Sequence, residues 1–247
     1  VLRSMGYEVV VLGPSDGGAL QLFVDAGAAV ITRPGIRATP NLWGLALCTD
    51  LVLVNTVVMA RTVRALSGTA VPVLWWLHDA FAGYPHIAHQ IPTKLAENVR
   101  LYSVGHHAAN AMHAVRPDFQ IGQLIYGLPD YAAEDFPRCD LGYPADKPLF
   151  ATVGSFERRK GHDIFCAAIR LLPEEVRNKA TFLFVGMAAD KEMMDAVRSL
   201  TTDCPENVFY CKRLSRDEIK NLMEQCTCLV CASRDDPMPT FVTEGLI

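Results

Sequence analysis

The sequence lacks a long apolar run and lacks any block of basic residues. Crossing a bilayer takes about 18 consecutive apolar residues, and the run Leu51–Ala60 is interrupted by Asn55 and Thr56. The formal charge is -4 at pH 7, with Lys and Arg spread along the 247 residues. Binding to nucleic acid needs clustered Lys and Arg to neutralise phosphates. The composition therefore argues against a membrane span and against nucleic acid as the main partner.

The eight cysteines do not follow the pattern of a disulfide-rich secreted domain. They lie in apolar contexts such as Phe165-Cys166-Ala167, and a chain of this length needs no cross-links to build a core. We therefore expect reduced core thiols in a cytoplasmic protein. Cys226, Cys228 and Cys231 contain a Cys-x-x-Cys pair, but thiols along one strand point to both faces and a second ligand pair is lacking. This favours a buried strand over a zinc site.

Continuous apolar strands alternate with helical segments along the whole chain. Strands are expected at residues 9–12, 28–32, 51–54, 72–76, 100–103, 120–125, 149–153, 181–185, 207–210 and 228–231. Helices are expected at about 18–26, 58–66, 106–115, 163–172, 191–200 and 216–224, and a last one begins near 240. Strands that are apolar throughout are typical of a parallel sheet covered by helices on both faces. The sequence predicts two Rossmann-like, doubly wound α/β domains.

The segment Tyr126–Lys147, which has no clear apolar periodicity, divides the chain into two halves. It is rich in Pro, Gly, Asp and Tyr, so we place a first domain at 1–126, a linker at 127–147 and a second domain at 148–247. Val1–Gly6 is typical of the C-terminal end of a helix that a glycine terminates. At the other end, the sequence stops at Glu244–Ile247, just after a helix is expected to begin. We expect a fragment in which the first domain lacks its first strand and the second lacks its C-terminal part.

Two carboxylates lie at the last junction between a strand and a helix. Asp236 is in the loop, Thr240 is expected to cap the helix, and Glu244 lies near its first turn. In open parallel sheets ligands bind at such junctions, because helix N-terminal N–H groups point beyond the strand end. Seven residues separate the carboxylates, so each could accept hydrogen bonds from a different hydroxylated group of one ligand. This predicts a site for a ligand with two such groups.

A basic segment lies at an equivalent junction upstream, in Val153–Gly161. There a strand ends at Gly154, and Arg158, Arg159 and Lys160 follow before the next helix. A basic triplet alone is more often a solvated turn. Placed at a strand end, however, Lys offers a point charge and Arg a planar fork for a phosphate.

Together these two segments resemble the retaining GT-B glycosyltransferases of family 4 (group 1), which carry an acidic-x7-acidic motif and an Arg-Lys-Gly segment after a glycine turn. The resemblance implies two domains facing a cleft and transfer of a sugar from a nucleotide-diphosphate donor with retention of configuration. It implies no metal and no other cofactor. By the family pattern Arg159 and Lys160 bind the diphosphate, Glu244 holds the ribose hydroxyls and Asp236 contacts the donor sugar. The N–H groups of Thr240 and Phe241 are expected to contact the diphosphate.

The sequence departs from the family pattern at two positions. Many members have arginine directly after the glycine, where this chain has Ser155, so the phosphate contact is expected to rest on Arg159. Members more often have glutamate in place of Asp236. Asp235 competes for the same role, and both aspartates are also compatible with a polar turn before proline.

A histidine ends an apolar strand in the first half, in Trp75-Trp76-Leu77-His78-Asp79. It resembles the histidine that family members carry near the transferred sugar, so His78 and Asp236 are the expected catalytic residues. A local structural role for His78 is the alternative. His86 and His89 have an i, i+3 spacing that could serve a metal together with His78 or Asp79, but no acidic triplet completes the ligand set and the family that the sequence resembles uses no metal.

The reading that the resemblance favours is a glycosyltransferase of polysaccharide biosynthesis. It would use a UDP- or GDP-sugar, act on a glycan or lipid-linked acceptor and work in the cytoplasm, with peripheral contact at the inner face of the membrane. A catalytically silent GT-B-like subunit that binds nucleotide sugar is the main alternative. A nucleotide-sugar epimerase is a third.

Overall fold

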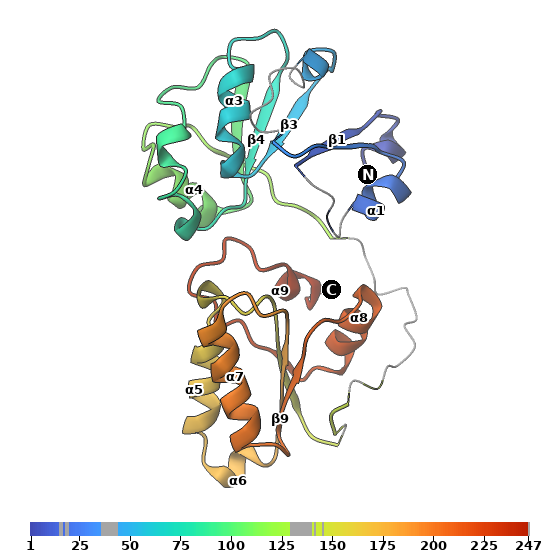
Figure 1. Cartoon of the computed structure of the whole chain (residues 1–247), viewed down its shortest axis with the longest axis vertical. Helices are drawn as coiled ribbons and strands as arrows, with labels where there is room; N and C mark the ends of the chain where they lie inside the picture. The colour runs from blue at the N-terminus through green and yellow to red at the C-terminus, as the bar shows by residue number, and fades with distance from the viewer. Residues whose placement is uncertain are drawn as a thin grey trace. The chain divides into compact units, whose positions relative to one another are not determined.

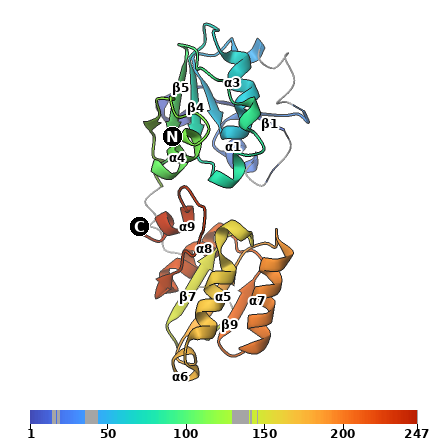
Figure 2. The same ribbon diagram turned by 90° about the vertical axis from the view of Figure 1, so that its left-hand side faces the viewer.

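The chain folds into two compact α/β units (Figures 1 and 2). The computed structural model describes residues 1–14, 17, 20–35, 44–128, 140, 142–144 and 146–246. The first unit comprises Val1–Asp79 and Gly83–Leu124, and the second comprises Ala80–Ala82 and Ile125–Ile247. Most of the linker predicted at 127–147 lies outside the described residues, so its extent stays a prediction.

The first unit contains two separate parallel sheets. Strand β1 (Val10–Gly13) pairs with β2 (Ala29–Thr32). The larger sheet has the order β3-β4-β5-β6 and consists of β3 (Val52–Asn55), β4 (Val73–Leu77), β5 (Val99–Ser103) and β6 (Gly122–Gln123). The helices are α1 (Leu20–Asp25), α3 (Ala60–Leu66) and α4 (His106–His113), with short 3-10 helices η1 (Arg3–Met5), η3 (Val57–Met59) and η5 (Ala88–Gln90). A further 3-10 helix, η4 (Phe81–Gly83), belongs to the second unit as far as Ala82.

Two features of the first unit differ from the prediction. We expected one sheet, but β1 and β2 pair only with each other among the described strands. Apolar periodicity identifies strands without specifying which of them pair. We also expected both faces to be covered, but β4 buries Trp75 and its neighbours on one face only and leaves Leu74 and Trp76 half-buried on the other. The buried face packs against α3 and α4 through Val63, Leu66 and Met112.

The second unit is a four-stranded parallel sheet with helices on both faces. Its order is β10-β7-β8-β9, with β7 (Leu149–Val153), β8 (Thr181–Val185), β9 (Val208–Cys211) and β10 (Cys228–Leu229). The helices are α5 (His162–Leu171), α6 (Glu174–Arg177), α7 (Lys191–Asp203), α8 (Arg216–Gln225) and α9 (Thr240–Glu244), and η6 (Arg158–Lys160) is a 3-10 turn.

Strand β8 shows how this second sheet is covered. All five of its residues are buried. Phe182 and Phe184 pack with α5 and α7 on one face, whereas Leu183 packs with Leu222 of α8 on the other. Figure 1 shows α5 and α7 together on one side of the sheet and α8 on the opposite side. The doubly wound α/β architecture predicted from continuous apolar strands is confirmed in this unit.

The cysteine-rich strand is shorter and more exposed than predicted. Among the described strands, β10 pairs only with β7, and this regular pairing covers only Cys228–Leu229. Cys228 and Cys231 are exposed, so the expectation of a buried strand is wrong for these side chains. Among the seven free cysteines that the structure describes, only Cys166 is buried. The partly buried Cys204, Cys211 and Cys226 pack against the core clusters, so the core-thiol interpretation fails only for the exposed Cys48, Cys228 and Cys231 among the described cysteines.

No helix in the described ranges is long and apolar enough to cross a membrane.

Candidate functional site

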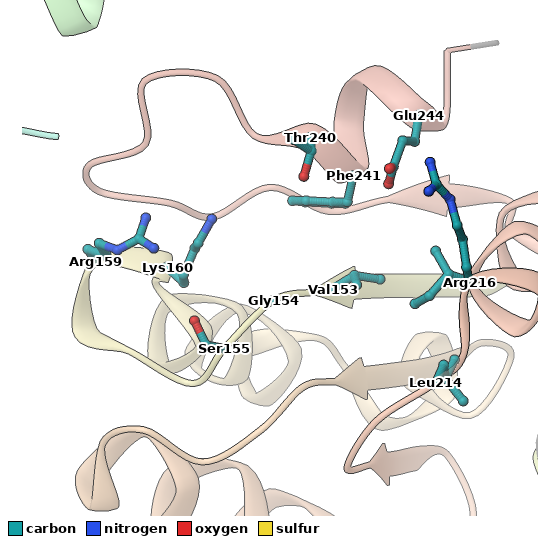
Figure 3. Close-up of a pocket in the computed structure, with 11 residues that line it drawn as sticks. Val153, Gly154, Ser155, Arg159, Lys160, Leu214, Arg216, Thr240, Phe241 and Glu244 are labelled. Atoms are coloured by element: carbon teal, nitrogen blue, oxygen red, sulfur yellow. The ribbon is translucent and has the colours of Figure 1, made fainter. Parts of the chain in front are cut away.

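A pocket of about 360 Å³ lies beyond the carboxyl ends of the strands in the second unit (Figure 3). Its walls come from the segments that follow β7 and β9 and from α9. The lining residues are Val153, Gly154, Ser155, Arg159, Lys160, Leu214, Arg216, Ile219, Thr240, Phe241 and Glu244. Five of the residues predicted to bind a donor therefore share one pocket.

Lys160 and Asp236 form an ion pair beside this pocket. The Lys160 Nζ donates to Asp236 Oδ2, and the two side chains are only 16% and 8% exposed. The residues are 76 positions apart in sequence, so the pair ties the turn after β7 to the loop after β10. A cation and an anion placed at one sheet edge can bind different groups of a single polar ligand.

Gly161 lets the turn bearing Lys160 approach the β10 loop closely. Its φ is +70°, in the left-handed region that favours glycine. A Cβ at this position would lie 1.9 Å from the carbonyl oxygen of Ala232. The glycine of the Arg-Lys-Gly segment is thus required for conformation and for space.

Arg159 is held next to the pocket by Glu157. The Arg159 Nε donates to Glu157 Oε2 at 2.8 Å, and the Ser155 hydroxyl donates to the other carboxylate oxygen. Burial raises the pKa of Glu157, but hydrogen bonds from Ser155 and Arg159 outweigh it, so the pKa lies below its usual value. Ser155, which stands where we expected an arginine in the family, takes part in this local network.

Arg234 connects the acidic loop to the basic turn. Its guanidinium makes a two-pronged contact with Asp163 at 2.7 and 2.6 Å and donates to the Arg158 carbonyl at 2.9 Å. Its backbone N–H donates to the Arg159 carbonyl at 2.7 Å. The loop that carries Asp236 is therefore fixed against η6 before any ligand binds.

Asp235 and Asp236, which the sequence leaves as alternatives, have different partners. The Asp235 carboxylate accepts hydrogen bonds from the N–H groups of Phe81 and Ala82 at 3.2 and 2.9 Å, and these three residues belong to the same unit. Asp236 faces Lys160 instead. Asp236, rather than Asp235, is therefore the aspartate that contacts a pocket-lining residue.

Helix α9 brings Thr240, Phe241 and Glu244 to the pocket (Figure 3). The prediction that Thr240 caps this helix is wrong: Pro239 is the N-cap, with no side-chain capping hydrogen bond, and Thr240 is the first helical residue. The two prolines already fix the extended entry into the helix. The Phe241 ring is 6% exposed and forms part of the wall. Burial raises the pKa of Glu244, and Arg216 opposes this shift.

The sequence interpretation missed two side chains at this site. Tyr126 donates from Oη to the Met238 carbonyl at 2.9 Å. Burial, followed by the charges of Asp236 and Glu244, raises its pKa. No motif signalled this contact across 112 positions. Arg216 lines the pocket, and its position could have been read from the Ser-x-x-Glu capping box that begins α8.

His78 lies in the first unit, directly after β4. Its ring packs 5.2 Å from that of Trp76, and its buried Nε2 has no hydrogen-bond partner among the described residues. Burial lowers the pKa of His78, and the charge of Asp79 opposes this. The Asp79 carboxylate accepts from the Val57 N–H at 2.6 Å. Of the predicted site residues, only His78 lies outside the second unit.

Both halves of the chain match glycosyltransferase family models. Residues 1–113 match the model described as glycosyl-transferase family 4, and residues 135–246 match glycosyl transferases group 1. Each match covers just under half of the chain, and together they support a GT-B glycosyltransferase of the family 4 and group 1 type. The family predicted from the acidic pair and the Arg-Lys-Gly segment is confirmed at this level. Among curated protein sequences, none matches the chain.

Solved structures share the fold of this chain at low sequence identity. WaaG, described as a glycosyltransferase involved in lipopolysaccharide biosynthesis, is 17% identical with a TM-score of 0.70, covering 99% of this chain and 72% of its own. A UDP-forming α,α-trehalose-phosphate synthase from Burkholderia xenovorans is 15% identical with a TM-score of 0.59, covering 82% and 56%. An E. coli structure bound with UDP-2-fluoro glucose is 12% identical with a TM-score of 0.61, covering 82% and 57%. The chain thus spans little more than half the length of these last two proteins.

Proposed function

We propose that the protein transfers a sugar from a nucleoside-diphosphate donor to an acceptor hydroxyl, with retention of configuration and without a metal. The main support for this proposal is the buried Lys160–Asp236 ion pair. Lys160 lines the same pocket of the second unit as Glu244. A cation, two carboxylates and the start of a helix suit a ligand that combines a diphosphate with two hydroxylated groups.

Each side chain has a proposed role in donor binding. Lys160 and Arg159 balance the diphosphate charge, which grows on the leaving group as the glycosidic bond breaks. The backbone N–H groups of Thr240 and Phe241 assist there. Glu244 accepts hydrogen bonds from the ribose hydroxyls. Asp236, which shares a hydrogen bond with Lys160 in the free protein, contacts the donor sugar.

The transfer step needs no covalent enzyme intermediate. The bond between the anomeric carbon and the phosphate oxygen breaks, and the acceptor oxygen forms its new bond on the same face of the sugar. The acceptor proton passes to the leaving phosphate oxygen. His78, whose lowered pKa keeps the imidazole neutral at pH 7, would contact the transferred sugar.

The names of the structural relatives suggest which donors and acceptors to test. The trehalose-phosphate synthase is called UDP-forming, and WaaG is linked to lipopolysaccharide. We therefore propose UDP-sugars first and GDP-sugars second, with a glycan or a lipid-linked glycan as acceptor. Such an acceptor would be met at the cytoplasmic face of a membrane.

A thermal-shift titration with UDP, GDP and ADP tests the donor site. A nucleotide present at about 100 times its dissociation constant should stabilise the folded protein by about 2.7 kcal/mol. One nucleotide should raise the melting temperature of the parent protein. The same nucleotide should not change the melting temperature of Lys160→Ala or of Glu244→Ala. Lys179→Ala and Glu175→Ala should respond like the parent, because both residues are exposed and come just before the start of β8, whereas the pocket lies beyond the carboxyl ends of the strands.

Three outcomes would each contradict a different part of this proposal. If none of the three nucleotides shifts the parent protein, the donor site is refuted. If binding is present but radiolabelled sugar is never transferred to any acceptor in a membrane extract, the catalytically silent reading replaces the enzyme. Product of inverted anomeric configuration, read by NMR, would overturn retention alone.

A further inference from the structure

Arg216 occupies a position where the helix itself disfavours a cation. It is the first residue of α8, a helix of ten residues that begins with a capping box. The Ser215 Oγ accepts from the Glu218 N–H at 3.2 Å, and the Glu218 carboxylate accepts from the Ser215 N–H at 2.6 Å. A helix N-terminus carries partial positive charge, which favours the acidic residues of this turn and opposes an arginine. The local structure therefore gives no reason for an arginine here.

The Arg216 side chain lies in the pocket and extends toward Glu244 (Figure 3). The two residues are on different helices, α8 and α9. Burial disfavours the charged form of Glu244, and the nearby guanidinium offsets part of that cost. The arginine thus acts on a carboxylate at the opposite end of the pocket from Lys160.

The other charged groups around Glu244 do not replace this contact. Tyr126 faces Glu244 and Asp236 from the segment after β6 and stays neutral at pH 7, since its pKa is raised. Lys160 is paired with Asp236, and Arg159 with Glu157. Within the described part of the chain, Arg216 is the cation whose charge acts on Glu244.

We propose that Arg216 is a positioning residue, which holds the Glu244 carboxylate charged and directed into the pocket to accept hydrogen bonds from the two ribose hydroxyls of a nucleoside diphosphate. This inference rests on the function proposed above and assigns a role to a residue outside the acidic pair and the Arg-Lys-Gly segment. A charged carboxylate accepts from both hydroxyls at once, whereas a protonated one gives up part of its acceptor capacity.

The pH dependence of binding follows from this role. Removing the guanidinium leaves burial unopposed, so the pKa of Glu244 rises further above its usual value. Glu244 then takes up a proton at a higher pH than in the parent protein. Nucleotide affinity should therefore fall more steeply in Arg216→Gln as the pH is lowered.

Calorimetric titration of the full chain with UDP, GDP and ADP, at about pH 8 and about pH 6, tests the inference. Arg216→Gln should raise the dissociation constant about tenfold at neutral pH, with a larger loss at the lower pH. Arg216→Lys should recover most of the affinity. Arg213→Gln removes an exposed arginine outside the pocket lining and should bind like the parent.

Two further readouts exclude a merely structural role. The unliganded Arg216→Gln protein should melt close to the parent's temperature, because the support lost by the Glu244 carboxylate and the removal of a cation from a helix N-terminus act in opposite directions. Adding Arg216→Gln to Glu244→Gln should cause little further loss, since the carboxylate it supports is already gone.

The possible failures are distinguishable. A parent protein that binds none of the three nucleotides overturns the proposed donor site, and this inference with it. A parent that binds, together with an Arg216→Gln variant that binds equally well or whose loss does not change with pH, overturns the inference alone. A loss of nucleotide affinity in Arg216→Gln that is accompanied by a large fall in the melting temperature of the unliganded variant also overturns the inference.

Discussion

Thr56, in the first unit, holds an unusual backbone conformation at the end of β3. Its φ of 73° and ψ of 158° lie in a region used almost only by glycine. Three hydrogen bonds impose this geometry: the Thr56 N–H donates to the Trp76 carbonyl, the Trp75 Nε1 donates to the Thr56 carbonyl, and the next N–H donates to Asp79. The Thr56 hydroxyl is buried with no hydrogen-bond partner among the described residues.

Thr56→Gly should therefore stabilise the protein. Relief of strain of about 1–3 kcal/mol outweighs the extra chain entropy of glycine, about 0.5–1 kcal/mol, so we expect a net gain of about 1 kcal/mol. Urea denaturation measures the free energy of unfolding. A variant less stable than the parent would show that the side chain contributes packing that exceeds the strain.

His162, at the start of α5, is a buried histidine that remains neutral. It is 1% exposed, its ring meets that of Phe156 edge-on at 4.4 Å, and neither ring nitrogen has a hydrogen-bond partner among the described residues. Burial, with a smaller effect from the Lys160 charge, lowers its pKa to about 4. Because the unfolded chain binds a proton near pH 6.5 and the folded protein does not, stability is complete above pH 6.5 and is lost as the pH falls toward 4.

The His162 contribution to this loss can be isolated by substitution. It amounts to at most about 3 kcal/mol, since each unit of pKa difference corresponds to about 1.4 kcal/mol. His162→Leu removes the titrating group, so its unfolding free energy should change less between pH 6.5 and pH 4 than that of the parent. An equal change in unfolding free energy with pH for parent and variant would mean that His162 takes up its proton as readily in the folded state as in the unfolded chain.

At the scale of elements, the turn after β7 and the loop after β10 are joined at Gly161. Gly161→Ala places a methyl group against the Ala232 carbonyl oxygen at a φ of +70°, so backbone has to move. We expect a loss of more than about 2 kcal/mol of stability and weaker nucleotide binding. Gly68→Ala is the matched control, since its φ is +77° but no atom of the described residues lies within 4 Å of an added Cβ. It should cost only about 1 kcal/mol, from backbone strain. Equal costs in thermal melts would contradict the close approach.

Sequence patterns predicted most elements of the second unit because continuous apolar strands mark a sheet covered on both faces. Leu149–Val153 and Thr181–Val185 have the predicted bounds. The separate β1–β2 sheet and the exposed cysteines of β10 depend on which strands pair, and local periodicity does not encode pairing.

For the site, the sequence supplied the residues but not their partners. The predicted order of strands and helices placed Lys160 and Glu244 after the carboxyl ends of strands, where ligands bind in open parallel sheets. The contact of Lys160 with Asp236, and that of Tyr126 with Met238, join residues 76 and 112 positions apart. Such contacts follow from the folded topology, which is why Tyr126 was missed, whereas the capping box that begins α8 could have indicated Arg216.

At the scale of the whole molecule, the chain contains two units with distinct roles in the proposed reaction. The second unit carries the pocket, with Lys160, Asp236 and Glu244 around it, and the first carries His78. Substitutions in the pocket should therefore change nucleotide affinity, whereas His78→Ala should lower the transfer rate while leaving nucleotide affinity within about twofold of the parent. Parallel binding and transfer assays compare the two. A large loss of nucleotide affinity in His78→Ala would contradict this division.

The central claim is that a nucleoside diphosphate occupies the pocket of the second unit. The most direct measurement is a crystal structure of the full chain with the nucleotide that raises its melting temperature. We predict density for the diphosphate at Lys160 and Arg159 and for the ribose at Glu244. Density for the nucleotide at any other place, with this pocket filled only by water, would contradict the account.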